Sequence, residues 1–433
     1  MSALEGLTNA PEVSLAEVDP VEAFVLPDAP VMGHKAFHGL VGKMVRTLEP
    51  HTEADPAGVL MALLVGLGIE LGPEVGWKVG PSFHPLRLFI VLMGQSAVGR
   101  KGTATEAANW LLKQVFHDAP ERSATGLASG EGLLWAVRDR VTTFKDGVEV
   151  ILSEGAKDKR LLVREEEFAR VLKAMAREGN TLGAQIRTAW DVGPDGIWQA
   201  LTRTPYKATG PHIGIVANVT PAELELCLKD IEILNGFGNR FLWASVRRSR
   251  SLPFGGEVKA EEYTRCAQTL RGRLEQARAD KWVMHWHAST REPWAAVYEV
   301  LNTPTPGKNS ALLSRGAPYV MRLAGLYAVL DGTNAVMPAH LEAASAVWDF
   351  SEDSIKYAFK VGTQDTQLER LRAALKEKGR MTLTEVRDLF KRNLETHRRD
   401  AMVKELIAAG LIVVKEEQAK AGKPAQVLEW IGG

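Results

Sequence analysis

Residues 86–110 read LRLFIVLMGQSAVGRKGTATEAANW, and this stretch decides the expected fold of the chain. Residues 88–93 are a continuous apolar run, which is typical of a parallel strand buried on both faces. Gly94 and Gly99 then bracket a loop without bulky side chains, and a helix is expected over residues 104–116. Because the backbone N–H groups of such a loop can point inward beside the positive end of a helix, the stretch predicts an anion-binding turn.

The loop is close to the phosphate-binding pattern G-x-x-x-x-G-K-[ST], in which a lysine contacts nucleotide phosphates and a hydroxyl binds magnesium. Arg100 stands at the lysine position and Lys101 follows it. We interpret the loop as one residue longer, with Lys101 on the phosphates and Thr103 on the metal; in the alternative register, Arg100 contacts the phosphates. A glycine-rich turn can also serve only as a tight corner. The predicted nucleotide-binding residues are Gly94, Gln95, Ser96, Ala97, Val98, Gly99, Arg100, Lys101, Gly102 and Thr103, with ATP and Mg²⁺ as ligands.

Composition limits the class of protein. The chain has 433 residues, 45% apolar and 24% charged, as expected of a soluble protein of two or three domains. Its formal net charge of zero argues against a uniformly basic nucleic-acid binder but allows a basic face on one domain. Cys227 and Cys266 have no metal or disulfide spacing, which fits a cytoplasmic location. The longest apolar stretch, residues 57–69, is too short for a membrane span and is predicted to be a buried helix. No signal peptide is recognised.

Three consecutive glutamates follow a short apolar strand at residues 161–163. In phosphate-loop ATPases, the strand beside the loop ends in carboxylates that hold magnesium and polarise the attacking water. We assign Glu165 to the metal and Glu166 to the general base, and a shift of one residue would make Glu167 the base. The alternative is a solvated acidic helix start, because glutamates suit the positive end of a helix.

Two further polar residues follow buried segments. A third apolar strand, residues 212–217, ends at Asn218, which in this class senses the γ-phosphate and orients water; the alternative is a helix cap. Residues 236–243 read GFGNRFLW and place Arg240 between a glycine turn and an aromatic run. We expect Arg240 to protrude and to reach the γ-phosphate of a neighbouring subunit. The alternative is an arginine paired with a local surface carboxylate.

The chain is expected to be an α/β protein with a P-loop NTPase core of the AAA+/RecA-like type. The helical lid resembles one that closes over the nucleotide, so that Arg322 would reach the phosphates. The predicted parts are a flexible acidic arm (1–32), an N-terminal helical collar (33–80), the ATPase core with a parallel sheet (81–255), the helical lid (256–362) and a winged helix (363–433).

The C-terminal segment has its own pattern. Helices are expected at residues 368–376, from Thr382 onward and at 396–409, followed by strands at 411–415 and 426–431 around a turn at 422–424. This order predicts a helix-turn-helix followed by a two-stranded wing. The residues expected to bind the DNA backbone are Arg392, Arg398, Arg399 and Lys404. Winged helices also dock proteins, which is the alternative.

These motifs together resemble a family of helicase-like ATPases that plasmids, phages and integrated elements encode, often near primases. The resemblance lies in GRKGT (99–103), TGLASGEGLLWAVR (125–138), RLLVREEEFARVLKAMAREGNT (160–181), NGFGNRFLWASVRRS (235–249) and RLAGLYAVLDG (322–332). More distantly, the motif order resembles AAA+ motors such as the minichromosome maintenance helicases, in which the arginine before a phenylalanine is the finger; carried over, this is Arg240. The departures are the stretched loop at 100–102 and Glu165 in place of aspartate, and both bear on hydrolysis more than on nucleotide binding.

The resemblance implies a DNA-translocating ATPase that forms a homo-hexamer, a replicative helicase of a mobile element that acts on single-stranded or forked DNA, with a primase as a partner and no membrane contact. The alternative is a nucleotide-switched origin-binding or helicase-loader protein that hydrolyses ATP slowly.

Overall fold

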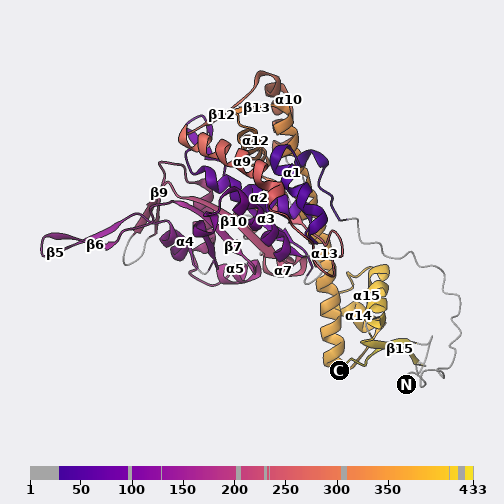
Figure 1. Cartoon of the computed structure of the whole chain (residues 1–433). Helices are drawn as coiled ribbons and strands as arrows, with labels where there is room; N and C mark the ends of the chain where they lie inside the picture. The colour runs from indigo at the N-terminus through magenta and orange to yellow at the C-terminus, as the bar shows by residue number, and fades with distance from the viewer. Residues whose placement is uncertain are drawn as a thin grey trace, which may run out of the picture. The chain divides into compact units, whose positions relative to one another are not determined.

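The computed structural model describes residues 29–95, 100–127, 129–200, 206–228, 232–233, 235–303, 310–408, 410–417 and 425–432. The chain is a mixed α/β protein with two compact units, a larger one of Asp28–Thr366 and a smaller one that contains Gln367–Gly433 (Figure 1). None of the described helices is both long and apolar enough to cross a membrane.

A five-stranded sheet forms the centre of the larger unit. Its order is β11-β3-β10-β7-β4, and every neighbouring pair is parallel. The strands are β3 (Phe89–Met93), β4 (Ser123–Thr125), β7 (Arg160–Glu165), β10 (His212–Val219) and β11 (Leu242–Ser245). We call the edge where these strands end the carboxyl edge, and the edge where they begin the amino edge. The predicted parallel α/β core is thus present, and β3 and β10 are buried throughout.

The strand order differs from expectation in one respect. The acidic strand β7 was expected beside the loop strand β3, but β10 lies between them and pairs with both. Asn218, not the glutamates, therefore ends the strand next to β3 on this side. Local sequence could not show this, because strand order depends on contacts between segments that lie far apart in the chain.

Two helices cover one face of the sheet. Helix α2 (Pro56–Leu71) is almost entirely buried, which confirms the buried helix predicted there. It packs directly on β10 at Gly214, where a Cβ atom would lie 2.7 Å from Ile69. Helix α3 (Lys101–Val115) lies against α2, since a Cβ on Gly66 would lie 2.7 Å from Leu112 (Figure 1).

The opposite face is covered by α5 (Phe168–Met175) and α6 (Leu182–Asp191). Phe89 is paired with Ile215, so it points away from the α2 side, and its ring meets Trp190 of α6 at 5.2 Å. One continuous apolar core runs from the first helices to the region predicted as a lid. The predicted collar, core and lid segments therefore belong to one compact unit.

A second sheet joins distant parts of the larger unit. Its order is β13-β12-β1-β2, with β1 (Gly76–Val79), β2 (Ser82–Pro85), β12 (Val283–Trp286) and β13 (Ala335–Val336). The prediction that the lid is helical throughout is wrong at β12 and β13. The segment does contain α9 (Glu261–Ala279), α10 (Ala288–Asn302), α11 (Ser310–Leu313) and α12 (Gly316–Leu330). Met284 is buried between exposed neighbours, an alternation too short to be recognised in the sequence.

The remaining elements of the larger unit are short. The strands β5 and β6 form an antiparallel hairpin, and its outer part carries exposed apolar side chains such as Phe144 and Val148. The bounds are α1 (Gly39–Leu48), α4 (Gly130–Ala136), β5 (Val141–Lys145), β6 (Val148–Ser153), β8 (Ile197–Ala200), β9 (Tyr206–Thr209), α7 (Pro221–Cys227) and the 3₁₀ helices η1 (His34–Ala36), η2 (Glu49–His51), η3 (Ala119–Arg122) and η4 (Gly238–Arg240).

The smaller unit has a core of its own around Leu375, Met402 and Leu428. The predicted helices and both predicted strands are present, and β14 adds a third strand in the antiparallel order β14-β16-β15. The elements are β14 (Arg380–Thr382), α14 (Leu383–Leu389), α15 (Thr396–Ala408), β15 (Ile412–Glu417) and β16 (Ala425–Trp430). The predicted break before residue 368 is wrong, because α13 (Pro338–Lys378) is one helix. The turn at 422–424 lies outside the described residues.

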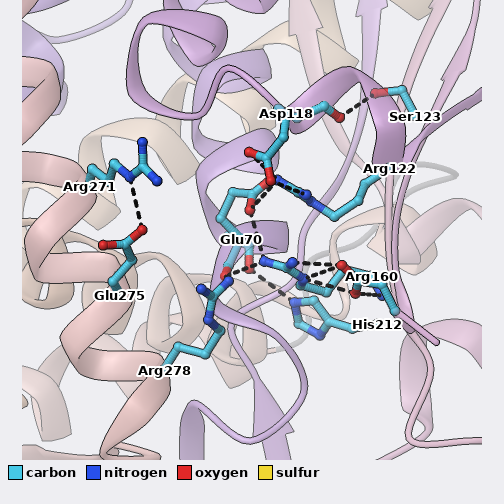
Figure 2. A network of polar contacts seen from close by, with 12 residues as sticks. Glu70, Asp118, Arg122, Ser123, Arg160, His212, Arg271, Glu275 and Arg278 are labelled. Carbon is cyan, nitrogen blue, oxygen red and sulfur yellow. Dashed lines mark hydrogen bonds and ion pairs between the residues drawn. The ribbon is translucent and has the colours of Figure 1, made fainter.

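A buried carboxylate ties α2 to the amino edge of the sheet. Glu70 is 2% exposed, and Arg122 reaches both of its oxygens at 2.8 Å (Figure 2). Arg160, at the start of β7, donates to the same carboxylate at 2.9 Å. Arg122 also donates to Asp118, and this hydrogen bond lowers the pKa of Asp118 to about 2. Glu70 therefore compensates two guanidinium groups that the fold has removed from water.

We expect Glu70→Ala to lower the free energy of unfolding by about 3 kcal/mol, because it removes the buried partner of Arg122 and Arg160 and leaves them only the partly exposed carboxylates of Asp118 and Asp158. Urea unfolding followed by circular dichroism measures this loss. Glu74→Ala is the matched control, since Glu74 pairs with Lys281 at the surface and its loss should cost about 1 kcal/mol or less. Equal losses in the two variants would contradict the role assigned to Glu70.

Candidate nucleotide site

The predicted strand, loop and helix meet at the carboxyl edge. β3 ends at Met93, and the N–H of Gly94 donates to the carbonyl of Val219 at 3.2 Å, which extends the pairing with β10. Helix α3 begins at Lys101, three residues before the predicted start. Gln95 is exposed at the edge. The predicted loop residues Ser96, Ala97, Val98 and Gly99 lie outside the described residues.

The two adjacent cations at the helix start point in different directions. Lys101 Nζ donates to the carbonyl of Gly94 at 2.7 Å, so its ammonium group lies back over the loop, and burial lowers the pKa of this amine. Arg100 has a left-handed backbone (φ 46°), and its guanidinium lies 2.8 Å from the carboxylate of Glu53. This arrangement favours the register in which Lys101, not Arg100, faces a bound phosphate. Thr103 lies half-buried in the first turn of α3.

One of the three glutamates faces this loop. Asn218 Nδ2 donates to Glu166 Oε2 at 2.8 Å, and the same oxygen lies 3.9 Å from where a Cβ of Gly102 would be. The ends of β7 and β10 thus bring Glu166 and Asn218 to the first turn of α3, where Lys101 and Thr103 lie. Glu167 begins α5 and is largely exposed, with its carboxylate 3.6 Å from Arg170.

Glu165 lies on the opposite face of the sheet. It pairs in register with Ala217, whereas Asn218 is the next residue and points the other way. Its carboxylate accepts hydrogen bonds from the N–H groups of Leu127 at 2.7 Å and Glu167 at 3.2 Å. The structure therefore does not bring Glu165 to the loop, contrary to the placement expected for a metal ligand. The alternation of side chains along β7 and β10 decides which glutamate faces the loop, and the sequence prediction left the register open by one residue.

Asn218 is buried, and its Oδ1 atom has no hydrogen-bond partner among the described residues. A buried amide oxygen without a partner is costly, so this atom is suited to accept a hydrogen bond from a water or ligand at the site. Helix α7 directly follows the end of β10, so Glu223 in its first turn lies at the same edge, and its charge opposes the lowering of the Lys101 pKa by burial.

A pocket of about 530 Å³ lies beside the N-terminal turn of α2. Its lining includes His34, Phe37, Arg46, Asp55, Arg247 and Phe350. This turn touches the start of α3, because a Cβ on Gly58 would lie 3.2 Å from the Cβ of Ala104. Glu53, which binds Arg100, also binds Arg248 just after β11. The pocket therefore adjoins the loop edge, although no motif in the sequence indicated it.

Two predicted site residues lie at the amino edge instead. Arg322 is buried against the ring of Trp190 and donates to the carbonyl of Arg87 at 3.3 Å. Residues 87 and 94 are separated by roughly 20 Å of extended strand, so Arg322 does not reach the loop and that prediction is wrong for this structure. The guanidinium of Arg240 lies 2.5 Å from the carboxylate of Asp191, and the hydroxyl of Tyr319 donates to the backbone carbonyl of Arg240.

The side chain of Arg240 is 9% exposed, so the expectation that it protrudes is not met. The pairing with a carboxylate, which was the alternative, is present. Asp191 is 49% exposed, so the ion pair borders solvent. Because Arg240 lies at the amino edge, it is far from the loop of its own subunit.

The basic residues predicted to bind DNA belong to the smaller unit. Arg392 pairs with Asp388 at 3.0 Å, and Arg399 pairs with Asp400 while its side chain is only 14% exposed. Arg398 donates to Gln367, and Lys404 is exposed. Arg392 and Lys404 are thus accessible to a phosphate backbone, whereas Arg399 is largely covered.

A group with metal-ligand chemistry lies elsewhere in the larger unit. His38, Asp331 and His340 place their ligand atoms within 4.8 Å of one another. The N–H of Met337 donates to Nδ1 of His340, so Nε2 of this ring carries the proton and donates to Asp331 at 3.2 Å. His38 also binds Asp331, at 2.7 Å, and this bond raises the pKa of His38. Asp331 thus binds both histidines, and the three side chains join the segments around α1, α12 and α13 by hydrogen bonds.

No protein-family model matches this chain, and a search of curated proteins finds no similar sequence.

Proposed function

We propose that the carboxyl edge of the central sheet binds ATP with magnesium and hydrolyses it. The observation that carries this proposal is the meeting of Lys101, Glu166 and Asn218 at the start of α3, from three separate segments of the chain. A cation, a carboxylate and a buried amide at the end of a parallel sheet are the groups that phosphoryl transfer needs. The five-stranded parallel sheet is compatible with a P-loop NTPase core.

Each residue has a distinct part in this proposal. Lys101 contacts the phosphates as a compact charge, and Thr103 offers its hydroxyl to the metal. Glu166 takes the place nearest the metal and the attacking water, and Asn218 holds its carboxylate and offers Oδ1 to that water. Glu167 is the second candidate for the base, because it follows Glu166 directly and its side chain is largely exposed. Magnesium, when bound, neutralises phosphate charge.

The pocket beside α2 is suited to the nucleoside part of the ligand. It adjoins the loop edge through Gly58 and Glu53, and its lining offers two phenylalanine rings, two carboxylates and three guanidinium groups. Its volume of about 530 Å³ is within the range of about 300–1,000 Å³ that ligand pockets occupy. The pocket and the loop together would hold the two ends of one nucleotide.

We assign the protein to the class of DNA-translocating motors, as a replicative helicase of a mobile element. The sequence resemblance supports this assignment, as does the smaller unit, whose helices and antiparallel strands have the order of a winged helix. The homo-hexamer and the primase partner rest on the resemblance alone. The second candidate is a slowly hydrolysing loader or origin-binding protein, which the stretched loop favours. Unwinding of forked DNA with ATP separates the two, because a loader would bind the fork without displacing a strand.

We expect Lys101→Ala to lower ATP hydrolysis by at least about 100-fold, because it removes the cation that contacts the phosphates. Arg100→Ala should have a much smaller effect, since Arg100 is engaged with Glu53. A steady-state ATPase assay measures both, with circular dichroism as the check on folding. If Arg100→Ala were the more damaging of two folded variants, the register proposed here would be wrong.

We expect Glu166→Gln to bind ATP and to lose turnover by about 10²–10⁴-fold, because the amide keeps the shape and loses the base. Size exclusion with ATP should show the assembled form accumulating. Glu165→Gln is the control, since its side chain faces away from the loop, and it should keep more turnover. Normal turnover in Glu166→Gln, together with loss in Glu167→Gln, would move the base to Glu167.

Arg240 is too far from its own loop to contact a phosphate there, so any such contact is with a neighbouring subunit. We expect Arg240→Ala to lower hydrolysis by about 10³-fold, the lower end of the range for arginine fingers, without weakening nucleotide binding. Mixing it with excess Lys101→Ala protein should restore part of the activity, because the added subunits supply intact Arg240.

Asp191→Asn separates this role from a structural one. It removes the ion pair but leaves the guanidinium in place, so a finger would keep acting. The same loss in Asp191→Asn and Arg240→Ala, with no rescue in mixtures shown to co-assemble, would mean that Arg240 only holds the fold of its own subunit.

A further inference from the structure

We propose that a second pocket, at the amino edge of the central sheet, binds a nucleotide unit of single-stranded nucleic acid, with the base against aromatic rings of α10 and the phosphate beside Arg315. The pocket has a volume of about 460 Å³, and its lining includes His84, Asn239, Trp294, Tyr298, Ser314 and Arg315. It is separate from the ATP site, which lies at the opposite edge of the sheet.

The aromatic wall of this pocket is held rigidly. Trp294 stacks on Trp286 with ring centres 4.6 Å apart and planes 20° apart, and Trp286 packs on buried Trp77 at 4.5 Å. Trp77 is fixed by a hydrogen bond from its indole N–H to the carbonyl of Met321 at 2.7 Å. Tyr298, one turn further along α10, is 46% exposed and meets Trp294 edge to face, with ring centres 5.6 Å apart and planes 63° apart. A tryptophan stack anchored in the core, with an accessible ring set against its edge, can hold a flat heterocycle between the two rings.

The charge around the pocket favours an anion. Arg315 lines it and shares the carboxylate of Asp191 with Arg240, at 3.5 Å and 2.5 Å. Behind them, Arg87 and Arg322 bind backbone carbonyls at the C-terminal end of α6. Burial lowers the pKa of Arg87 to about 9 and that of Arg322 to about 10, so both stay charged at neutral pH. Two guanidinium groups thus share the one carboxylate of Asp191, and the two behind them have only backbone carbonyls as partners, which leaves a positive field at the pocket.

The polar groups of the pocket are mostly engaged within the protein. Asn239 donates to Ser314 at 2.8 Å and accepts from Arg315 at 3.1 Å, so its amide orients Arg315 and has little capacity left for a base edge. Asn302 likewise donates to the carbonyl of Tyr298 at 2.8 Å. Stacking plus one cation, with few free amides, is typical of sequence-tolerant strand binding and is a poor means of selecting a free nucleotide.

The test uses the full-length protein and a fluorescein-labelled oligothymidylate, with fluorescence anisotropy at fixed salt and without ATP. Tyr298→Ala and Arg315→Gln should each weaken binding by about tenfold, in line with the contribution of one stacked base. Phe254→Ala and Arg291→Gln are the controls, because Phe254 is fully exposed elsewhere and Arg291 is an exposed cation on α10 outside the pocket. Both controls should bind as the unaltered protein does.

A second measurement locates the strand directly. An oligothymidylate that carries 5-iodouracil should cross-link on irradiation to the peptide with Trp294 and Tyr298, and excess AMP should not prevent this. Unchanged affinity in both pocket variants, or cross-links elsewhere only, would overturn the proposal. Competition by AMP at this peptide would make the pocket a free-nucleotide site and would overturn the assignment to a strand. If Tyr298→Ala and Arg315→Gln lost self-association but kept oligonucleotide binding, the pocket would be a contact between subunits, and the proposal would likewise be overturned.

The pocket proposal does not rest on ATP hydrolysis. Lys101→Ala protein should bind the oligonucleotide as the unaltered protein does, so failure at one edge of the sheet is distinguishable from failure at the other.

Discussion

The register of β10 against its two neighbours is the constraint on which the candidate site depends. β10 pairs with β3 through Asn218 and Leu92, and with β7 through Ala217 and Glu165. Because side chains alternate along a strand, this register puts Asn218 and Glu166 on the α3 face and Glu165 on the other. A slip of one residue would bring Glu165 to the loop and bury Glu166. The bulk of α2 against Gly214 holds the register, since this face admits no side chain there.

What the sequence could predict is what depends on local pattern. The apolar runs of β3 and β10, the buried helix α2 and the helix start at Thr382 each carry their own signal within a few residues. The capping box at Thr382, with Glu385 three residues later, is present as its residue types predict. Lys101 and Asn218 belong to this group too, because Asn218 lies at the end of an apolar strand and Lys101 follows another through a short loop, so the strand direction fixes the edge of both.

The remaining features depend on contacts between distant segments. β12 and β13 are strands because β1, some 200 residues earlier along the chain, offers an edge to pair with. Arg322 and Arg240 have the residue type that binds phosphate, but their edge is set by how α12 and the segment before β11 lie against the start of β3. A motif tells which chemistry a side chain offers and says nothing of which end of the sheet it reaches.

The C-terminal end of α6 explains how the amino edge tolerates its arginines. Arg87 donates to the carbonyls of Ala189 and Val192, and Arg322 donates to that of Trp190 and lies over its ring. These carbonyls lie at the negative end of the helix, so two buried cations stabilise it and need no carboxylate of their own. The carboxylate of Asp191, the last residue of α6, therefore forms its ion pairs with Arg240 and Arg315. The same helix end thus holds two arginines inside the protein, and through Asp191 it binds buried Arg240 and partly exposed Arg315, the one that an anion in the pocket can meet.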